Sequence, residues 1–379
     1  MKISVTFKTV FIALLALVSC AKIKYIQPMQ STDAALNWPM FGGNPARNNV
    51  YPGALTLPLE LIWHFKASSA IESYLSVVDG AVFFGTKDGR IVSLDIRTGE
   101  KIGNIKMDVA STFTVADTNV IIARRYGDKT LFSYDLRKSK MKWGVDAGDI
   151  SSEPLVFGAS IIVTALYNHI DLYELRSGVR IWQTKIKEQI RSSPAVSGNI
   201  IVFGADDGVV YAVKKIDGAI LWTYATGSSV VATPAIFNDT VYIGSSDRTL
   251  YALNAADGAL KWTFSAEGQI LQSAAVNDTV LLFSSTDSHV YCLNPATGAL
   301  NWKFEAQSVI STSPLICNDK VVFGSLDRHL YLVDLQTGKE LWKYQTRGRI
   351  RTMPVVWGDY LIAASENNDV YAFKTAGEE

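Results

Sequence analysis

The chain has 379 residues, of which 36 are basic and 36 acidic, so its formal net charge is zero. This balance provides no overall field that would attract nucleic acid or another polyanion, and we expect no nucleic-acid partner. The length exceeds the roughly 250–300 residues at which single hydrophobic cores stop growing, so we expect several domains or a repeat architecture.

Residues 1–19 have the pattern of a targeting segment. Basic residues precede an apolar run, residues 10–18, that is too short to span a bilayer. The run ends at Cys20 in the order Leu-Val-Ser-Cys, which resembles the lipobox whose cysteine is diacylated after cleavage. An ordinary secretory signal with an incidental cysteine is the alternative. A lipidated Cys20 would tether the protein to a membrane, and Ala21 does not match the inner-membrane retention signal. We therefore expect the periplasmic face of the outer membrane in a bacterial cell envelope.

Residues 20–57 follow as the lipidated N-terminus and a linker or strap. They contain four prolines and a Gly-Gly pair without any sustained period, which is typical of a linker or a surface segment. The stretch from Trp38 to Arg47 is too aromatic for a simple spacer. We expect part of this segment to pack on the folded domain.

Residues 58–374 repeat with a period of 40 residues, shortened once to 39. One position of the repeat is tryptophan in seven copies and glycine in one. The series is Trp63, Gly103, Trp143, Trp182, Trp222, Trp262, Trp302 and Trp342. A period of this size marks a repeat architecture. Four residues before each position after Trp63 stands a glycine, or Ser139 in one copy, which predicts a turn ahead of the tryptophan strand.

Each repeat contains four short apolar runs, seen clearly at residues 193–197, 199–204, 209–213 and 219–224. The pair Asp207-Gly208 predicts a two-residue hairpin in which both central residues have positive φ. Three successive hairpins make a four-stranded antiparallel sheet, and such sheets repeated around an axis form a propeller. We therefore predict an all-β fold built from propeller blades.

The prolines place the strands within each blade. Proline lacks an amide donor and belongs at the start of a strand or on an edge strand. It opens the first run in five repeats, as Pro154, Pro194, Pro234, Pro314 and Pro354. The first run should therefore be the innermost strand, lining the central channel, and the tryptophan strand should be the outermost.

The two ends of the repeat region complement each other. The last repeat stops at residue 374 without a tryptophan strand, whereas the first tryptophan strand, residues 60–66, precedes the first complete repeat. We predict that strand 60–66 pairs with the C-terminal blade and closes an eight-bladed ring. Residues 375–379 would form a short tail.

The stretch Ala252–Trp262 reads Ala-x-Asn-x-x-Asp-Gly-x-x-x-Trp, and Leu332–Trp342 reads Leu-x-Asp-x-x-Thr-Gly-x-x-x-Trp. These motifs resemble the tryptophan-docking repeat of the pyrroloquinoline-quinone-type propellers, over residues 58–374. The resemblance implies that the seven tryptophans dock neighbouring blades. Two branches of this superfamily are relevant: the quinoprotein dehydrogenases, and the lipoprotein subunit of the machinery that assembles outer-membrane β-barrels.

The dehydrogenase branch implies a quinone held over a vicinal disulfide, calcium bound by acidic and amide ligands, and an Asp base. The three cysteines here are not adjacent, and we expect Cys292 and Cys317 to be buried free thiols, with a disulfide between them as the alternative. The periodic aspartates occupy hairpin positions, and the four histidines lack metal-ligand spacing. We therefore expect no catalytic residue, metal or cofactor. A quinone- or small-ligand-binding enzyme or sensor, with pyrroloquinoline quinone and calcium, remains the alternative.

The assembly branch implies that a loop bearing Leu and Arg near the middle of the chain contacts the periplasmic repeats of the central barrel subunit. The pair Ile190-Arg191 matches that place. The acidic pair expected one blade later is absent, because Ser229 and Val231 stand there, and this departure weakens the match at the partner surface.

The register also predicts which loops surround the channel mouth. The position three residues before the proline marker, or before the equivalent residue in blades that lack the proline, is Glu72, Ser151, Arg191, Val231, Leu271, Ser311 and Arg351. Arg347, Arg349 and Arg351 alternate, so we expect them on one face as a basic patch. A solvated channel rim is the alternative. We expect a non-enzymatic, lipid-anchored scaffold, monomeric within a complex, that binds a protein partner through Ile190, Arg191, Arg349 and Arg351.

Overall fold

A computed structural model describes residues 37–107, 109–150 and 152–376. The predicted signal peptide and the lipidation site at Cys20 lie outside these residues. None of the described residues forms a helix that is long and apolar enough to cross a membrane.

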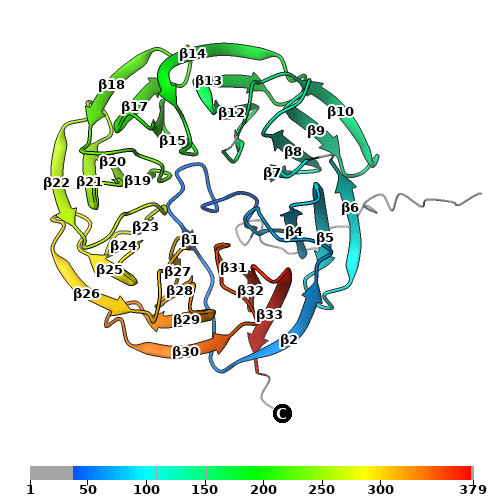
Figure 1. Cartoon of the computed structure of the whole chain (residues 1–379), viewed down its shortest axis with the longest axis vertical. Coiled ribbons are helices and arrows are strands. Elements are labelled where there is room, and N and C mark those ends of the chain that lie inside the picture. The colour runs from blue at the N-terminus through cyan, green and yellow to red at the C-terminus, as the bar shows by residue number, and fades with distance from the viewer. Residues whose placement is uncertain (1–36, 108, 151, 377–379) are drawn as a thin grey trace, which may run out of the picture.

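Eight sheets are arranged as blades around a central axis, which confirms the predicted eight-bladed propeller (Figure 1). Blades one to four contain β3 (Ser76–Val78), β4 (Ala81–Thr86), β5 (Arg90–Asp95) and β6 (Lys101–Lys106); β7 (Ser111–Ala116), β8 (Asn119–Arg124), β9 (Leu131–Asp135) and β10 (Lys140–Val145); β11 (Leu155–Phe157), β12 (Ser160–Ala165), β13 (Tyr167–Glu174) and β14 (Arg180–Gln189); β15 (Ala195–Ser197), β16 (Ile200–Gly204), β17 (Val209–Lys214) and β18 (Ile220–Ala225). Blades five to eight contain β19 (Ala235–Phe237), β20 (Thr240–Gly244), β21 (Thr249–Asn254) and β22 (Leu260–Ser265); β23 (Ala275–Val276), β24 (Leu281–Ser284), β25 (His289–Leu293) and β26 (Leu300–Glu305); β27 (Leu315–Cys317), β28 (Lys320–Gly324), β29 (His329–Asp334) and β30 (Glu340–Gln345); β31 (Val355–Trp357), β32 (Tyr360–Ser365), β33 (Asp369–Thr375) and β2 (Leu59–Lys66).

Burial along each blade follows from its position between two neighbours. The second strand of a blade is covered on both faces, so a segment such as β28 is apolar and buried along nearly its whole length. The tryptophan strand lies at the outer rim and alternates, as β30 does, between exposed and half-buried side chains. Inner strands carry the prolines at their start and outer strands carry the tryptophans, as predicted.

The ring closes by pairing the two ends of the repeat region. In the antiparallel pair β2 and β33, Leu59 lies opposite Thr375 and Lys66 lies opposite Asp369. The Asp369 side chain is fully buried at this seam, where its Oδ1 lies 2.7 Å from His64 Nε2 and 3.3 Å from Lys66 Nζ. The C-terminal strand extends to Thr375, one residue past the predicted boundary at 374. The predicted closure is confirmed.

The hairpin at Asp207-Gly208 differs from the predicted two-residue turn. Gly208 has φ of 81°, but Asp207 is not among the residues with positive φ. Asp207 Oδ1 instead accepts the backbone N–H of Val209 at 2.9 Å, so the aspartate stabilises the turn through its side chain. Both central residues have positive φ in a different turn, at Asn238 and Asp239, between the first two strands of blade five.

Tryptophans of the outer strands dock one blade onto the next. Trp222 is 8% exposed, and its Nε1 donates to the carbonyl of Ala255 at 2.9 Å. Its ring packs on Gly258, where an added Cβ would lie 2.6 Å from Trp222 Cε3. The same ring-on-glycine contact joins Trp63 to Gly99, Trp143 to Gly178, Trp182 to Gly218, Trp262 to Gly298 and Trp302 to Gly338.

One pair of departures from the repeat has a common cause. Gly103 replaces the tryptophan in the outer strand of blade one, so no ring is present at that position to pack on the next blade. In that next blade, the position four residues before Trp143 is Ser139 rather than glycine, with φ of 49°. A Cβ is tolerated where no tryptophan ring covers it.

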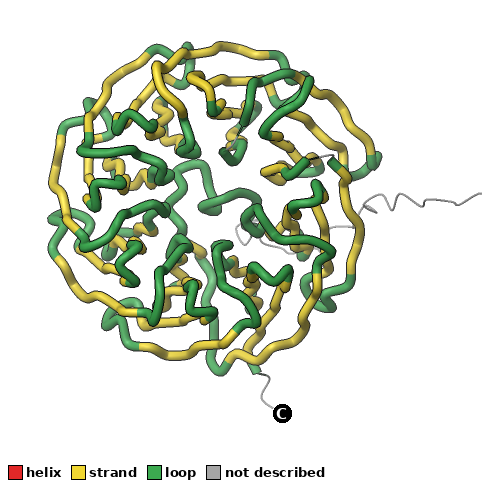
Figure 2. Tube along the Cα trace, viewed as in Figure 1, coloured by secondary structure: helices red, strands yellow, loops and turns green. Residues whose placement is uncertain are grey.

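The segment before β2 packs on the propeller, as predicted, and crosses the centre of the ring (Figure 2). We call residues 37–53 the strap. Strap carbonyls accept backbone N–H groups from the inner strands of six blades, with the pairs Trp38–Val77, Pro39–Val115, Pro45–Val196, Ala46–Ile236, Asn48–Val276 and Asn49–Ile316. The strap also forms β1 (Val50–Tyr51), which pairs in parallel with β27 as a fifth strand of blade seven.

The two remaining cysteines are free and buried, which excludes the alternative of a disulfide between Cys292 and Cys317 in this structure. Cys317 Sγ lies 3.2 Å from the carbonyl oxygen of Gly53 at the end of the strap. Burial raises the pKa of the Cys292 thiol to about 11 and that of the Cys317 thiol to about 12.

Candidate functional site at the channel mouth

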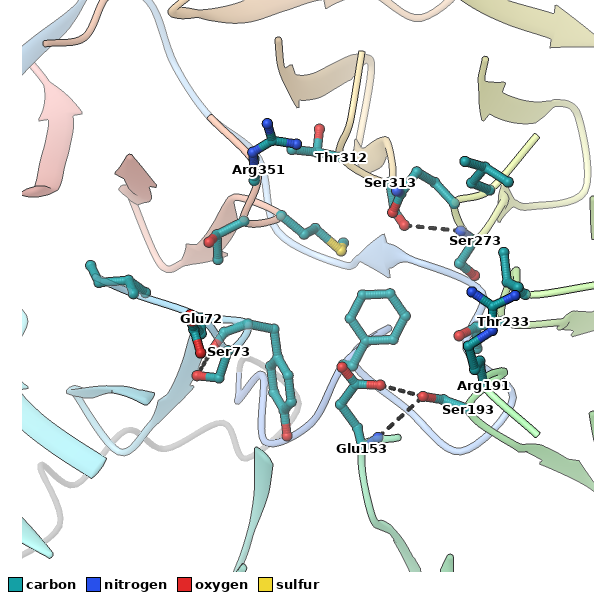
Figure 3. A pocket seen from close by; sticks show the side chains of 18 residues that line it. Glu72, Ser73, Glu153, Arg191, Ser193, Thr233, Ser273, Thr312, Ser313 and Arg351 are labelled. Carbon is teal, nitrogen blue, oxygen red and sulfur yellow. Dashed lines mark hydrogen bonds between the residues drawn. The ribbon is translucent and has the colours of Figure 1, made fainter. Parts of the chain in front are cut away.

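A hollow of about 540 Å³ lies at the end of the channel where the inner strands begin. Its residues come from the loops that enter the inner strands, and Phe41 of the strap also lines it (Figure 3). We call this cavity the mouth hollow. Its volume is within the range of roughly 300–1,000 Å³ that is typical of small-molecule sites.

The structure brings together most of the loop positions that the repeat register assigns to the mouth. Glu72, Arg191, Val231, Leu271 and Arg351 all line the hollow. Of the other two positions, Ser151 lies outside the described residues. Ser311 does not line the hollow, and its hydroxyl donates to the carbonyl of Ile350 at 2.9 Å.

The two arginines of the hollow are half exposed and each has one acidic neighbour. Arg191 Nε lies 2.9 Å from Asp206 Oδ1, and the Arg191 side chain is 52% exposed. Arg351 Nε contacts Glu366 Oε1, and its side chain is 53% exposed. Exposed ion pairs of this kind contribute only about 0–1 kcal/mol, so both guanidinium groups can rearrange to meet a partner.

Two other predicted partner-binding residues lie elsewhere. Ile190 is fully buried in a core cluster with Leu155 and Ile162, so its side chain cannot contact a partner directly, contrary to the prediction. Arg349 is exposed but does not line the hollow, so Arg351 alone of the three alternating arginines does so.

An arc of hydroxyl groups in the hollow was not predicted from the sequence. Ser193, Thr233, Ser273 and Ser313 recur at 40-residue steps on the channel side of blades four to seven. The residue directly before each proline marker, or before Ala274 in blade six, is the signal that identifies them. One neighbouring pair is linked directly, since Ser273 N donates to Ser313 Oγ at 3.1 Å.

Glu153 occupies the same register in blade three and extends this arc. The Glu153 carboxylate accepts a hydrogen bond from the Ser193 hydroxyl. The backbone N–H of Glu153 donates to Ser193 Oγ at 3.2 Å. Glu153 makes no ion pair within 4.0 Å among the described residues. The other acid that lines the hollow, Glu72, does have a basic neighbour, since its Oε1 lies 3.8 Å from Lys87 Nζ.

Arg47 lies buried behind the hollow and anchors the strap. Its Nε donates to the Pro194 carbonyl at 3.1 Å, and its Nη1 donates to the Phe41 carbonyl. Burial lowers the pKa of Arg47, and the charge of Glu153 opposes that shift. Nη2 is buried with no hydrogen-bond partner in the described part of the chain.

Within the described ranges, no group of three or more His, Cys, Asp and Glu side chains is placed to hold a metal ion. The periodic aspartates instead connect turns: Asp247 Oδ2 accepts from the backbone N–H of Gly227 and from the hydroxyl of Tyr251, both at 2.7 Å.

The tryptophan-docked ring of eight blades defines the class of the protein as a propeller of the pyrroloquinoline-quinone type. The family model described as "Beta-alanine-activating enzyme, beta-propeller" matches residues 150–379, and the chain belongs to this family. A second model, described as "Outer membrane protein assembly factor BamB", matches residues 60–183. No curated protein matches the sequence.

Solved structures with the same fold come from both branches. BamB from Moraxella catarrhalis is 18% identical with a TM-score of 0.72, over 84% of this chain and 100% of that chain. A europium-containing methanol dehydrogenase is 12% identical with a TM-score of 0.78, over 89% of this chain and 98% of that chain. The computationally designed Ika8 protein is 18% identical with a TM-score of 0.73, over 86% of this chain and 99% of that chain. At these identities the likeness shows the fold.

Proposed function

We propose that the protein is a non-enzymatic scaffold, anchored by lipid at Cys20 to the periplasmic face of the outer membrane, that holds a protein partner of β-barrel assembly. The lipobox pattern supports the anchor, and the match of residues 60–183 to the BamB model supports the assembly role. The partner on this proposal is the periplasmic repeats of the central barrel-assembly subunit. No resident cofactor is required.

The observation that carries this proposal is the pair of half-exposed arginines at the channel mouth. Arg191 and Arg351 enter the hollow from blades four and eight, and each uses Nε for its acidic neighbour. The planar guanidinium group presents several donors, so each can bind a further carboxylate. A partner with acidic loops would match this surface, and the arginines would accelerate association more than they would tighten the complex.

Affinity capture from detergent-solubilised envelopes tests the proposal. We expect the full-length protein to recover a barrel-assembly subunit, and R191E/R351E to recover much less because the charge complementarity is reversed. The matched control is K303E, on the outer strand β26, where Lys303 is exposed and far from the mouth loops in the blade. Equal recovery by both variants, or no barrel-assembly subunit in any capture, would refute the proposal.

The quinone-binding alternative has its own assay. On the scaffold proposal, pyrroloquinoline quinone with calcium leaves the melting temperature unchanged and produces no dye-linked alcohol oxidation. A clear rise in melting temperature, or oxidation that depends on both additions, would favour the alternative.

A further inference from the structure

The mouth hollow has a charge arrangement that a protein partner does not require. Two arginines and two glutamates line it, so its formal charge is balanced. A ligand that is only a cation or only an anion would meet a group of its own sign across a small cavity. A ligand that carries both signs would not.

Glu153 is the natural site for the positive end of such a ligand. Its carboxylate faces the hollow and accepts a hydrogen bond from the Ser193 hydroxyl. It has no ion-pair partner within 4.0 Å in the described part of the chain. Aromatic rings lie in the same cavity, since Phe41 and Tyr74 both line it with centroids 6.0 Å apart. A carboxylate beside aromatic rings is the combination that ammonium groups favour.

Arg191 is the natural site for the negative end. It stands two residues before Ser193 in the loop that enters blade four, so the loop that contacts Glu153 also carries the guanidinium group (Figure 3). Its Nε is occupied by Asp206, whereas its Nη groups have no hydrogen bond within the described residues. Guanidinium groups bind carboxylates through two parallel hydrogen bonds, which would fix the direction of the ligand.

The remaining hydroxyl groups of the hollow lie further along the arc, beyond the loop that carries Arg191, where they can extend the contacts of a longer ligand. Thr233, Ser273 and Ser313 continue the arc away from Glu153 and each can donate or accept. Peptide groups need both kinds of partner. The volume of about 540 Å³ exceeds what one amino acid fills and leaves room for a short peptide.

We propose that the mouth hollow binds a small zwitterion, a free amino acid or a short peptide, with its ammonium group on Glu153 and its carboxylate on Arg191. This proposal does not rest on the scaffold function, because the isolated protein would bind the ligand without a partner.

Isothermal titration of the full-length protein in detergent tests the proposal, with trialanine as the probe. We expect trialanine to bind, and N-acetyl-trialanine and trialanine amide to bind about tenfold more weakly or worse, because each lacks one charged hydrogen bond. Alanine in a parallel titration distinguishes the two sources, since tighter binding of alanine than of trialanine assigns the site to free amino acids.

Variants identify which residue meets which end. E153Q should weaken trialanine about tenfold while changing N-acetyl-trialanine little, and R191Q should weaken trialanine while changing trialanine amide little. K303Q on the outer rim is the control, and unchanged melting temperatures show that the variants fold. The proposal is overturned if trialanine and alanine give no binding heat at millimolar concentration, or if blocked and free peptides bind equally to the wild-type protein.

Discussion

The packing of Trp222 on Gly258 makes the most direct prediction about what holds the blades together. We expect Gly258→Ala to destabilise the protein for two separate reasons. Gly258 has φ of +74°, where an alanine costs about 1–2 kcal/mol. The new Cβ would also lie 2.6 Å from Trp222 Cε3 and 2.7 Å from Cδ2, and overpacking of a well-packed site costs about 1–3 kcal/mol.

Gly198→Ala is the matched control. Gly198 has φ of +53°, but an added Cβ would meet nothing within 4 Å. Both variants share the backbone strain and the reduced freedom of the unfolded chain, so these effects largely cancel in the comparison. The difference of about 1–3 kcal/mol isolates the contact with the tryptophan ring.

The assay is urea unfolding followed by far-ultraviolet circular dichroism, with Trp222→Gly as the second background. In that background the penalty of Gly258→Ala should fall to the Gly198→Ala value, which reproduces the natural pair Gly103 and Ser139. If Gly258→Ala costs no more than Gly198→Ala in the wild-type background, the docking account is wrong.

Three further predictions concern the seam, the strap and the thiols. Deleting residues 366–379 removes β33 and leaves β2 unpaired, so we expect a lower yield of soluble folded protein and a lower melting temperature; an unchanged melting temperature would contradict ring closure. Arg47→Ala removes two hydrogen bonds to a charged group, worth about 1.5–3 kcal/mol each. We therefore expect urea unfolding to show a free energy of unfolding lower by at least about 1.5 kcal/mol. A urea midpoint equal to that of the wild-type protein would show that the strap needs no anchor. The pKa values of Cys292 and Cys317 are raised from 9.0 to about 11 and about 12, so neither thiol should react with iodoacetamide at pH 8 until the protein unfolds. Because the folded pKa values exceed the unfolded ones, burial of the neutral thiols contributes stability that is complete below pH 9 and is lost as the pH rises toward 12. Rapid alkylation of the native protein at pH 8 would contradict the burial.

The architecture was predictable because the repeat contains its own register. Tryptophans at 40-residue steps, prolines at the start of the inner strands and an unpaired tryptophan strand at residues 60–66 together specify eight blades and their closure. Each of these signals lies within one repeat, and its recurrence at the same position in the other repeats shows that it does not arise by chance. The hairpin at Asp207-Gly208 was mispredicted because an aspartate side chain that accepts the N–H of Val209 stabilises a turn without positive φ at the aspartate.

The strap and the hollow were less predictable because their contacts are made once. Arg47 is fully buried although arginine is usually exposed, and its carbonyl partners belong to Phe41 and Pro194, far apart in the chain. Ile190 was predicted to bind a partner but is buried, because its place beside Arg191 in the sequence does not determine which way its side chain points. The hydroxyl arc has a periodic signal, but serine and threonine are common in loops and their role appears only with the hollow.

Photo-crosslinking in cells tests the central claim, that the channel mouth holds an assembly partner. A photoreactive amino acid is placed at Leu271, which lines the hollow, and at Leu300, which is exposed on the outer rim. The scaffold account predicts a crosslink to a barrel-assembly subunit from position 271 and none from position 300. A crosslink to that subunit from position 300 alone, or from neither position in cells that assemble barrels normally, would contradict it.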